Sequence, residues 1–228
     1  MVLSIETSDN LCAVAFTDDG QILTEYQHEL PFQHAALVGH LVQQGITFLS
    51  HEDREKTFNE TDIHLVAVAI GPGSFTGLRI GLSYAQGFCF GRNIPIVGIS
   101  NHQVLASFSP RAEKQVYTVI EARQEEVYLA RHLFLRPGYS TIENHQLLKK
   151  SQLPEAIISP SVLICHRHLV LPEKTLDALH SRGVWVINSA RYSAAVVAEL
   201  GVHKFRLNGA DNLSEIEPLY IRPFAGIA

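Results

Sequence analysis

The sequence predicts an α/β protein of two lobes, each a mixed sheet flanked by helices. In the first hundred residues, short β-branched and apolar runs alternate with stretches of helical period, in the order β-β-β-α-β-α-β. The second half opens again with two alternating strands, which indicates that one architecture is used twice. We expect an N-terminal lobe over residues 1–108 and a C-terminal lobe over 109–228, with the boundary near 107–114.

The elements of the first lobe follow from turns and from changes of period. Asp18-Asp19-Gly20 is typical of a hairpin turn, so the chain opens as an antiparallel meander. From Gln33 the apolar residues recur with helical period, and the nearly all-apolar run 63–70 suits a strand covered on both faces. The expected elements are strands 2–7, 11–17 and 21–26, helix 33–48, strand 63–70, helix 75–90 and strand 95–99.

The pattern of the second lobe is weaker. Its expected elements are strands 115–120, 127–135, 162–165 and 184–187, and a helix over 189–200. Gly201 is expected to end that helix, because glycine is common just past helix C-termini. Residues 136–160 contain turn residues without a firm period, so no element is expected there.

Composition and charge argue against several classes of protein. A net charge of −5 without a basic run argues against tight nucleic-acid binding by the chain alone. Three scattered cysteines, Cys12, Cys89 and Cys165, argue against a disulfide framework or a zinc ribbon. No apolar stretch approaches the roughly 20 residues that cross a bilayer, and the chain opens without a signal-peptide pattern. We therefore expect a soluble cytoplasmic protein without a membrane partner.

The most informative stretch is Gly71-Pro72-Gly73-Ser74-Phe75-Thr76-Gly77-Leu78-Arg79-Ile80-Gly81, where a buried strand turns into a helix. Gly71 and Gly73 permit a tight turn, Ser74 can cap the helix, and free N–H groups there could receive an anion. The stretch nevertheless lacks the Lys and Ser or Thr of a Walker loop, and the Gly-x-Gly-x-x-Gly spacing of dinucleotide sites. As a generic nucleotide motif it is weak.

The helix after this turn carries a stripe of small residues. Gly77, Gly81 and Ala85 recur every four residues, although each interior glycine costs roughly 1 kcal/mol relative to alanine. Such a stripe lets another helix approach closely. The pattern leaves two interpretations open, a helix pair within the chain and an interface between subunits.

At this motif the sequence resembles the TsaB (YeaZ) family, the bacterial accessory subunits of threonylcarbamoyladenosine biosynthesis. Residues 71–81 match the signature of that family almost letter for letter, and Leu3-Ser4-Ile5-Glu6-Thr7-Ser8 is similar to its opening strand. Supporting similarity covers most of the chain, namely His34 with Leu37 and Leu41, residues 95–100, residues 121–128 and residues 217–222.

The resemblance implies a two-lobed fold of the actin, Hsp70 and sugar-kinase type. It also implies a non-catalytic subunit that docks and activates the catalytic paralogue TsaD, which transfers threonylcarbamoyl to adenosine 37 of tRNAs that read codons beginning with A. The other implied partners are the ATPase TsaE, a second copy of the chain when it is alone, and tRNA through the complex only. The implied interface lies on the first two helices, at Phe32, His34, Leu37, Leu41, Phe75, Gly77, Leu78, Gly81, Leu82 and Ala85. A bulky residue at Gly81 is then expected to abolish pairing while sparing the fold.

We expect no catalytic chemistry from the chain itself. The resembling catalytic paralogue carries a His-x-x-x-His metal pair, but here Ala106 stands four residues after His102, so we expect no metal and no cofactor. Glu6 occupies the place where actin-like ATPases hold a carboxylate near the metal and phosphates. The residues expected nearest to a phosphate are Glu6, Thr7, Ser8, Gly73 and Ser74. The rival interpretations are a stand-alone ATPase or sugar kinase of the same fold, and a metallopeptidase.

Overall fold

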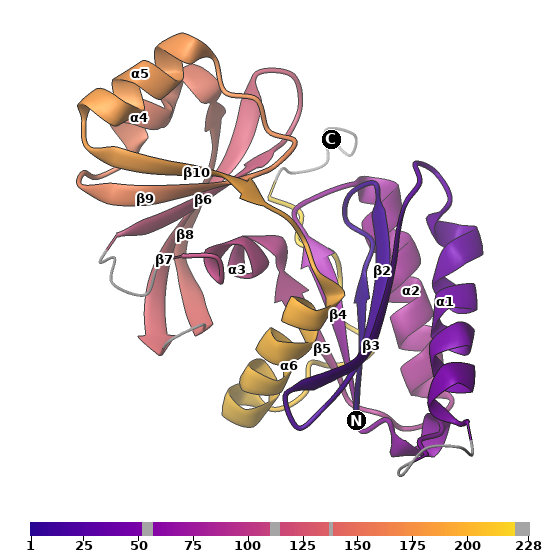
Figure 1. The fold of residues 1–228 in the computed structure, drawn as a ribbon. Helices are drawn as coiled ribbons and strands as arrows, with labels where there is room; N and C mark the ends of the chain where they lie inside the picture. Colours follow the sequence, from indigo (N-terminus) through magenta and orange to yellow (C-terminus); the bar gives the residue numbers. More distant parts are fainter. Residues whose placement is uncertain (52–56, 110–114, 137–138, 222–228) are drawn as a thin grey trace. The chain divides into compact units, whose positions relative to one another are not determined.

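A computed structural model describes residues 1–51, 57–109, 115–136 and 139–221, and the chain divides into two compact units. The first unit consists of residues 1–100 and 193–218, and the second of residues 101–192 with the segment after Pro218. Each unit is built on one five-stranded sheet (Figure 1). The end of the similarity at Arg222 lies outside the described residues.

The first sheet has the strand order β3-β2-β1-β4-β5. Its first three strands form an antiparallel meander, as the Asp-Gly turn predicts, and β4 and β5 extend the sheet in parallel with β1. The strands are β1 (Val2–Glu6), β2 (Leu11–Asp18), β3 (Gln21–Glu29), β4 (Leu65–Gly71) and β5 (Ile96–Ser100). The expected strands of this lobe are therefore confirmed, with shifts of a few residues at their ends.

The second sheet repeats this topology in the order β10-β9-β6-β7-β8. A meander lies on one side of β6, and two parallel strands lie on the other side. The strands are β6 (Val116–Glu121), β7 (Glu126–Arg136), β8 (Tyr139–Lys149), β9 (Ser161–His166) and β10 (Val184–Ala190). The expectation of one architecture used twice is confirmed. Sequence reasoning missed β8, because this edge strand carries polar residues on both faces and has no apolar alternation.

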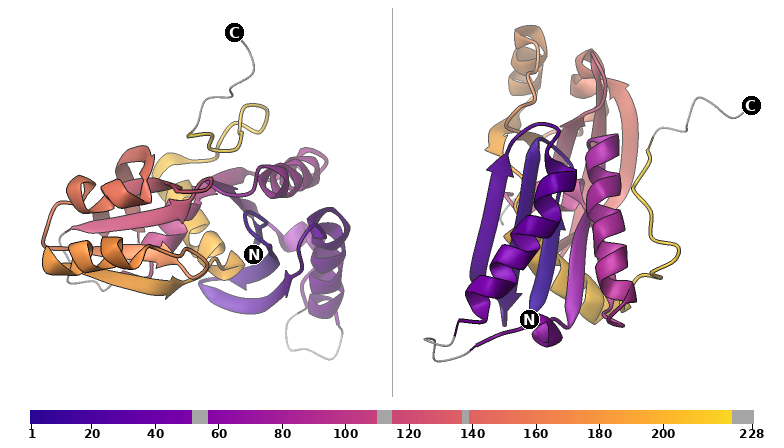
Figure 2. Two further views of the ribbon diagram at one scale, coloured as in Figure 1. Left: turned by 90° about the horizontal axis from the view of Figure 1, so that it is seen from above. Right: turned by 90° about the vertical axis from the view of Figure 1, so that its right-hand side faces the viewer.

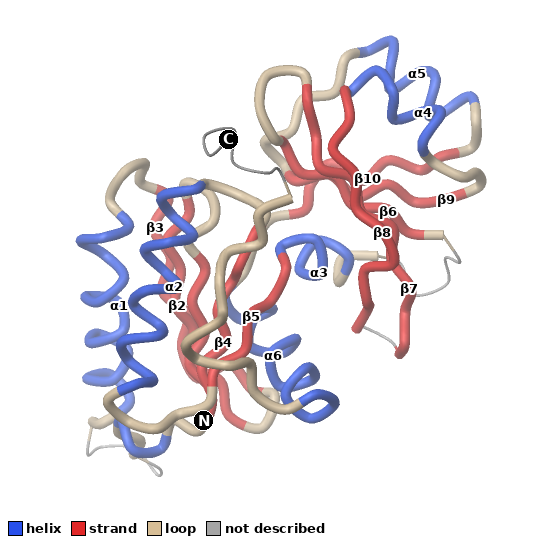
Figure 3. Tube along the Cα trace, turned by 180° about the vertical axis from the view of Figure 1, so that it is seen from behind, coloured by secondary structure: helices blue, strands red, loops and turns tan. Residues whose placement is uncertain are grey.

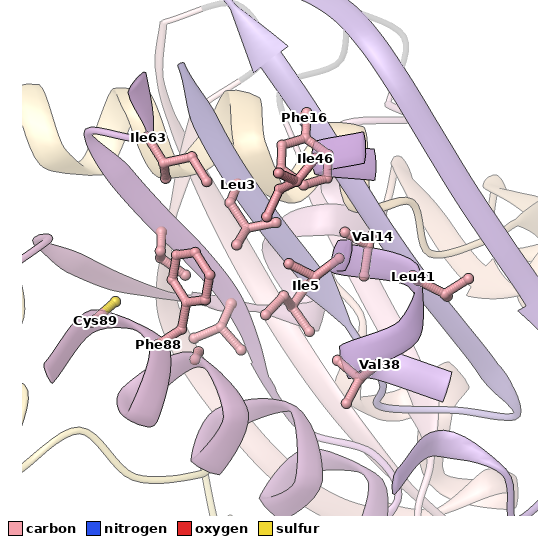
Figure 4. Close-up of a cluster of buried hydrophobic side chains, with 14 of the residues drawn as sticks. Leu3, Ile5, Val14, Phe16, Val38, Leu41, Ile46, Ile63, Phe88 and Cys89 are labelled. Carbon is pink, nitrogen blue, oxygen red and sulfur yellow. The ribbon is translucent and has the colours of Figure 1, made fainter. Parts of the chain in front are cut away.

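Two helices cover one face of the first sheet, and a third covers the opposite face (Figure 2). The pair is α1 (His34–Leu49) and α2 (Phe75–Phe90), which lie side by side, and the third helix is α6 (Ala194–Asn208). Apolar side chains of α1 and α2 interlock with those of β1, β2 and β4 in the core of this unit. Figure 4 shows part of this cluster, with Leu3, Ile5, Val14, Phe16, Val38, Leu41, Ile46, Ile63, Phe88 and Cys89 labelled.

The last helix differs from its prediction at both ends. It begins five residues later than expected, where the Ser193 hydroxyl accepts a hydrogen bond from the Val196 N–H at 3.3 Å. It then runs through Gly201 and ends before Gly209, whose φ is +79°. A Cβ atom at Gly201 would overlap the Cβ of Ala67 on β4. Gly201 therefore serves close packing of α6 on the sheet, and the expectation that it ends the helix was wrong.

In the second unit, α3 (Asn101–Ala106) packs against β6, β8 and β9, and α5 (Glu173–Ser181) packs against β10 (Figure 3). The short α4 (Leu153–Ala156) contacts α5 and contributes to the apolar cluster of that face. Two 3-10 turns complete the elements, η1 (Glu60–Asp62) in the first unit and η2 (Lys150–Gln152) in the second. Among the described segments, no helix is long and apolar enough to cross a membrane.

The boundary between the two units differs from the expected boundary after residue 108. The first unit ends at Ser100, and the expected boundary region 107–114 lies beyond that point, with 110–114 outside the described residues. Residues 193–218 return to the first unit. The physical reason is helix packing, because α3 follows the first sheet but packs on the second, and α6 follows the second sheet but packs on the first.

A buried hydrogen-bond chain lies between α3 and the second sheet. The Nδ1 of His102 lies 2.7 Å from the Thr118 hydroxyl, which lies 2.8 Å from the Nε2 of His132. The Nδ1 of His132 lies 3.0 Å from the Ser140 hydroxyl. Burial lowers the pKa of His132 to about 3 and that of His102 well below its usual range. Both rings are therefore neutral in the folded protein.

These two histidines predict that the second unit loses stability in mild acid. Below about pH 6.5 the unfolded chain binds protons on these two rings, whereas the folded chain does not. The free energy of unfolding therefore has its full value above about pH 6.5 and decreases as the pH falls below it. Each histidine contributes a slope of up to about 1.4 kcal/mol per pH unit. Urea unfolding followed by the fluorescence of Trp185, the only tryptophan and a residue of β10, measures this slope.

The matched variant is His132→Asn, which removes one of the two titrating rings. Between about pH 6.5 and 5, where carboxylates stay ionised, its slope is expected to be smaller than that of the parent chain. The slope is compared rather than the absolute stability, because the substitution also alters packing. Equal slopes for the two proteins would contradict the prediction.

Candidate functional site

The glycine-rich turn after β4 packs directly on the hairpin between β1 and β2. The Ser74 N–H donates to the Ser8 carbonyl oxygen at 2.6 Å, and the Thr7 hydroxyl donates to the Gly77 carbonyl oxygen at 2.8 Å. A Cβ atom at Gly73 would overlap the Ser8 carbonyl oxygen, so glycine is required for this approach. The turn and the hairpin form one structural unit at the ends of β1 and β4.

The five residues expected nearest to a phosphate are brought together here, but they bond to one another and to the turn. Glu6 is fully buried, and its Oε1 accepts from the Ser8 N–H at 2.6 Å and from the Ser8 hydroxyl. The Ser74 hydroxyl accepts from the Gly77 N–H at 3.2 Å, which caps α2 as the sequence predicts. These contacts stabilise the turn from within the chain.

The small-residue stripe of α2 needs a correction. A Cβ atom at Gly77 would overlap the Thr7 carbonyl oxygen, and one at Gly81 would overlap the Thr7 hydroxyl. Ala85, the third member of the stripe, is fully buried in the apolar core of the first unit. Gly77 and Gly81 therefore face the end of β1 of the same chain, and Ala85 faces the core of the first unit. The expectation that a bulky residue at Gly81 spares the fold was wrong for the same reason.

The structure sorts the ten expected interface residues by exposure. Three of them reach solvent, Phe32 and Phe75 as exposed residues and Leu37 as a half-buried one. The other seven are buried within the first unit, namely His34, Leu41, Gly77, Leu78, Gly81, Leu82 and Ala85. These seven support the helices from inside, and the expectation that they face a partner does not fit their burial.

The solvent-facing side of α1 and α2 has almost no charge. The two helices contain 16 residues each, and Arg79 is the only Lys, Arg, Asp or Glu among them. A helix on a protein surface normally carries several charged residues on its outer face. Apart from Arg79, the exposed positions are small, amide or aromatic, at Ala35, Ala36, Gln43, Gln44, Thr47, Phe48, Phe75, Thr76, Ser83, Gly87 and Phe90, together with His40.

Exposed aromatic rings border this surface. Phe32, just before α1, is 98% exposed and has a φ of +61°, and Phe90, at the end of α2, is 81% exposed. The Arg79 guanidinium lies 3.8 Å from the centre of the Phe75 ring, so the single charge stacks on an aromatic face. A phenylalanine in the left-handed region is rare and strained. Sequence reasoning missed Phe90, although an aromatic residue at a helix end outside the core stripe is a usable signal.

The three cysteine thiols are buried, and the described part of the chain shows no cluster of metal ligands. Burial raises the pKa of the Cys12 thiol to about 11, with a further rise from the nearby Glu6 carboxylate, and burial raises those of Cys89 and Cys165 to about 12. At neutral pH these thiols are protonated and are weak nucleophiles. Within residues 1–51, 57–109, 115–136 and 139–221, no group of three or more His, Cys, Asp or Glu side chains is placed to hold a metal ion.

The packing of α2 on Thr7 predicts opposite effects for two alanine substitutions in one helix. Gly81→Ala places a methyl group against the Thr7 hydroxyl, which is fixed by its bond to Gly77, and should lower the free energy of unfolding by about 1–3 kcal/mol. Gly87→Ala meets no atom within 4 Å and should raise it by up to about 1 kcal/mol, because alanine favours helix. Urea denaturation measures both. Similar values for the two variants would show that Gly81 does not serve this contact.

Comparison with known proteins places the chain in a family. The family model described as "TsaD: tRNA N6-adenosine threonylcarbamoyltransferase" matches residues 54–194. The chain is 32% identical over 133 residues to the "tRNA threonylcarbamoyladenosine biosynthesis protein TsaB" of Escherichia coli (strain K12), covering 58% of this chain and 54% of that protein. The protein of the same name from Bacillus subtilis (strain 168) is 28% identical over 127 residues, covering 56% and 52%. The matched part thus spans about half the length of these curated relatives.

A solved structure extends the similarity in fold to nearly the whole chain. The structure described as "YeaZ from Pseudomonas aeruginosa" superposes with a TM-score of 0.77 at 21% sequence identity, and the match covers 96% of this chain and 99% of that one. The predicted fold class, two mixed sheets flanked by helices, is confirmed. The chain belongs to the tRNA N6-adenosine threonylcarbamoyltransferase (TsaD) family and, within it, groups with the TsaB (YeaZ) proteins.

Proposed function

We propose that this protein is a non-catalytic subunit of the machinery that makes threonylcarbamoyladenosine in tRNA, and that it docks and activates a catalytic paralogue of the TsaD type. The observation that carries the proposal is the outer side of α1 and α2, which is nearly free of charge and bordered by exposed aromatic rings. The names of the curated relatives supply the process. The match to the TsaD family model supports a partner of the TsaD type, because it indicates that this chain and such a partner are paralogues.

The physics of protein interfaces favours this surface. Aromatic residues are enriched in the centres of interfaces, and Lys, Glu and Asp are depleted there. The outer side of α1 and α2 has that composition, with Phe32, Phe48 and Phe75 exposed and one arginine. Arg79 stacks on the Phe75 ring within this surface, so its charge is already packed against an aromatic face. The docking surface is therefore built from the exposed residues, and the buried glycines only hold the helices in place.

The same surface suits a second copy of the chain when the catalytic paralogue is absent. Burying an apolar helix pair is favourable whichever protein supplies the other half, and a two-fold interface needs only one self-complementary patch. We expect TsaE and tRNA to be met through the assembled complex. The net charge of −5 supports the expectation for tRNA, because tight binding of tRNA by the isolated chain would need a basic surface.

Nucleotide hydrolysis by the chain alone has weaker support. It would use the carboxylate of Glu6 and the turn at Gly73 and Ser74. The Glu6 carboxylate already accepts hydrogen bonds from the N–H and the hydroxyl of Ser8. The Ser74 N–H already donates to the Ser8 carbonyl oxygen. A phosphate would have to displace these buried contacts. The metallopeptidase alternative would need a metal site, which the side chains of the described segments do not form.

Light scattering of the purified chain, alone and mixed with the TsaD paralogue of the same organism, tests the proposal. A homodimer that exchanges into a one-to-one heterodimer is the expected result. Phe32→Ser should weaken the heterodimer at least about tenfold, which corresponds to about 1.4 kcal/mol, because an exposed aromatic anchor is lost without any loss of core packing.

The control is Leu207→Ser, which removes an exposed apolar side chain of α6 on the opposite face of the same sheet. This variant should pair like the parent chain. Two persistent monomers in the mixture would overturn the proposal. Equal losses for Phe32→Ser and Leu207→Ser would show that docking does not use the side of α1 and α2.

A further inference from the structure

A pocket of about 300 Å³ opens on the second sheet, in the other unit from the proposed docking surface. Its floor is formed by β6, β7 and β8, and its wall by the chain that leaves α4. The part of β7 and β8 near their connection extends past α4 and α5, so the face of the sheet that carries these two helices is left uncovered there (Figure 1). The volume is at the lower end of the range for small-molecule sites.

The strand register places the lining side chains on one face. Tyr117 pairs with Arg131, and Arg131 pairs with Asn144, while Leu129 pairs with Gln146. Directly paired residues project from the same side of a sheet, so β7 presents Leu129 and Arg131 between a tyrosine and two amides. Tyr117 and Leu129 are each only 3% exposed and form the apolar base of the pocket.

A β-bulge places charges of both signs at one end of the pocket. The register of β7 and β8 shifts between Arg131 and His132, which leaves Glu143 as an extra residue on β8. Its carboxylate lies 3.1 Å from the Nε of Arg131. Nothing in the described segments bonds to the two terminal nitrogens of this guanidinium. They remain as donors beside an acceptor carboxylate.

Tyr117 adds a buried hydroxyl with an unused donor. Its oxygen accepts a hydrogen bond from the Ile158 N–H at 3.3 Å, which ties the wall of the pocket to its floor. The phenol has one proton of its own, and the described residues offer it no acceptor. The opposite side of the pocket is apolar, with Leu129, Ala156 and the half-exposed Ile158.

From this arrangement we infer that the pocket binds a small zwitterion, an α-amino acid with an apolar side chain. The carboxylate of the ligand accepts from the terminal nitrogens of Arg131 and from the Tyr117 hydroxyl. Its ammonium group donates to Glu143 and to the amide oxygens of Asn144 and Gln146. The apolar side chain of the ligand covers Leu129, Ala156 and Ile158.

The paired charges distinguish this ligand from simpler ones. A lone anion is attracted by Arg131 but repelled by Glu143, and a lone cation meets the reverse, so each gains little net electrostatic energy. In an α-amino acid the ammonium and carboxylate groups are attached to the same carbon atom. They are therefore close enough for the two adjacent side chains, Glu143 and Arg131, to bind one group each. Its binding does not depend on docking through α1 and α2, and the two proposals can fail separately.

The test is a titration of the full chain with L-leucine, followed by two-dimensional ¹H–¹⁵N NMR. The Ile158 backbone amide and the side-chain amides of Asn144 and Gln146 should shift together, with a Kd of about 1 mM or below. L-leucinamide lacks the carboxylate and N-acetyl-L-leucine lacks the ammonium group, so each should bind at least about tenfold more weakly, the value of one lost charged contact.

Arg131→Gln should weaken leucine binding at least about tenfold. The matched control is Arg92→Gln in the other unit, because Arg92 forms a comparable half-exposed ion pair with Glu60 and should leave binding unchanged. The inference is overturned if leucine shifts none of these amides, if Arg131→Gln binds like the parent, or if N-acetyl-L-leucine binds as well as leucine, which would indicate an anion site.

Discussion

The first unit depends on the contact between the glycine-rich turn and the end of β1. Three positions without a side chain, Gly73, Gly77 and Gly81, allow the backbone of α2 and its preceding turn to lie against Thr7 and Ser8. Two hydrogen bonds of 2.6 and 2.8 Å then fix the turn on the hairpin. This contact sets the position and the rotation of α2 on the sheet. The rotation decides which residues of α2 are buried and which remain available to a partner.

The fold was largely accessible from the sequence, because its elements follow local rules. The Asp-Gly turn, the apolar run over 63–70 and the serine cap before α2 each predicted a feature that the structure contains. β8 was not accessible, because an edge strand with polar residues on both faces has no period to detect. Gly201 misled for a related reason. Glycine marks both helix ends and close packing, and only tertiary structure distinguishes the two uses.

The candidate site was accessible in part. The resemblance placed the expected interface on α1 and α2, and two of the expected residues are exposed there, Phe32 just before α1 and Phe75 on α2. The glycine stripe left two interpretations open, because spacing alone does not show whether a small residue makes room for a partner or for the backbone of its own chain. The pocket of the second unit was not foreseen. It depends on a bulge at Glu143 and on the register of three strands, and the sequence encodes neither in a readable pattern.

The exchange of helices between the two units has a consequence for synthesis on the ribosome. β1 to β5 emerge within the first hundred residues, but the helix that covers the second face of their sheet ends at Asn208. An apolar face built from strands such as β1 and β4 is thus left without its covering helix while half of the chain is still being made. Chains with such long-range contacts fold slowly and are exposed to aggregation before completion. A chaperone that shields the first sheet would therefore act on the nascent chain until α6 has been made.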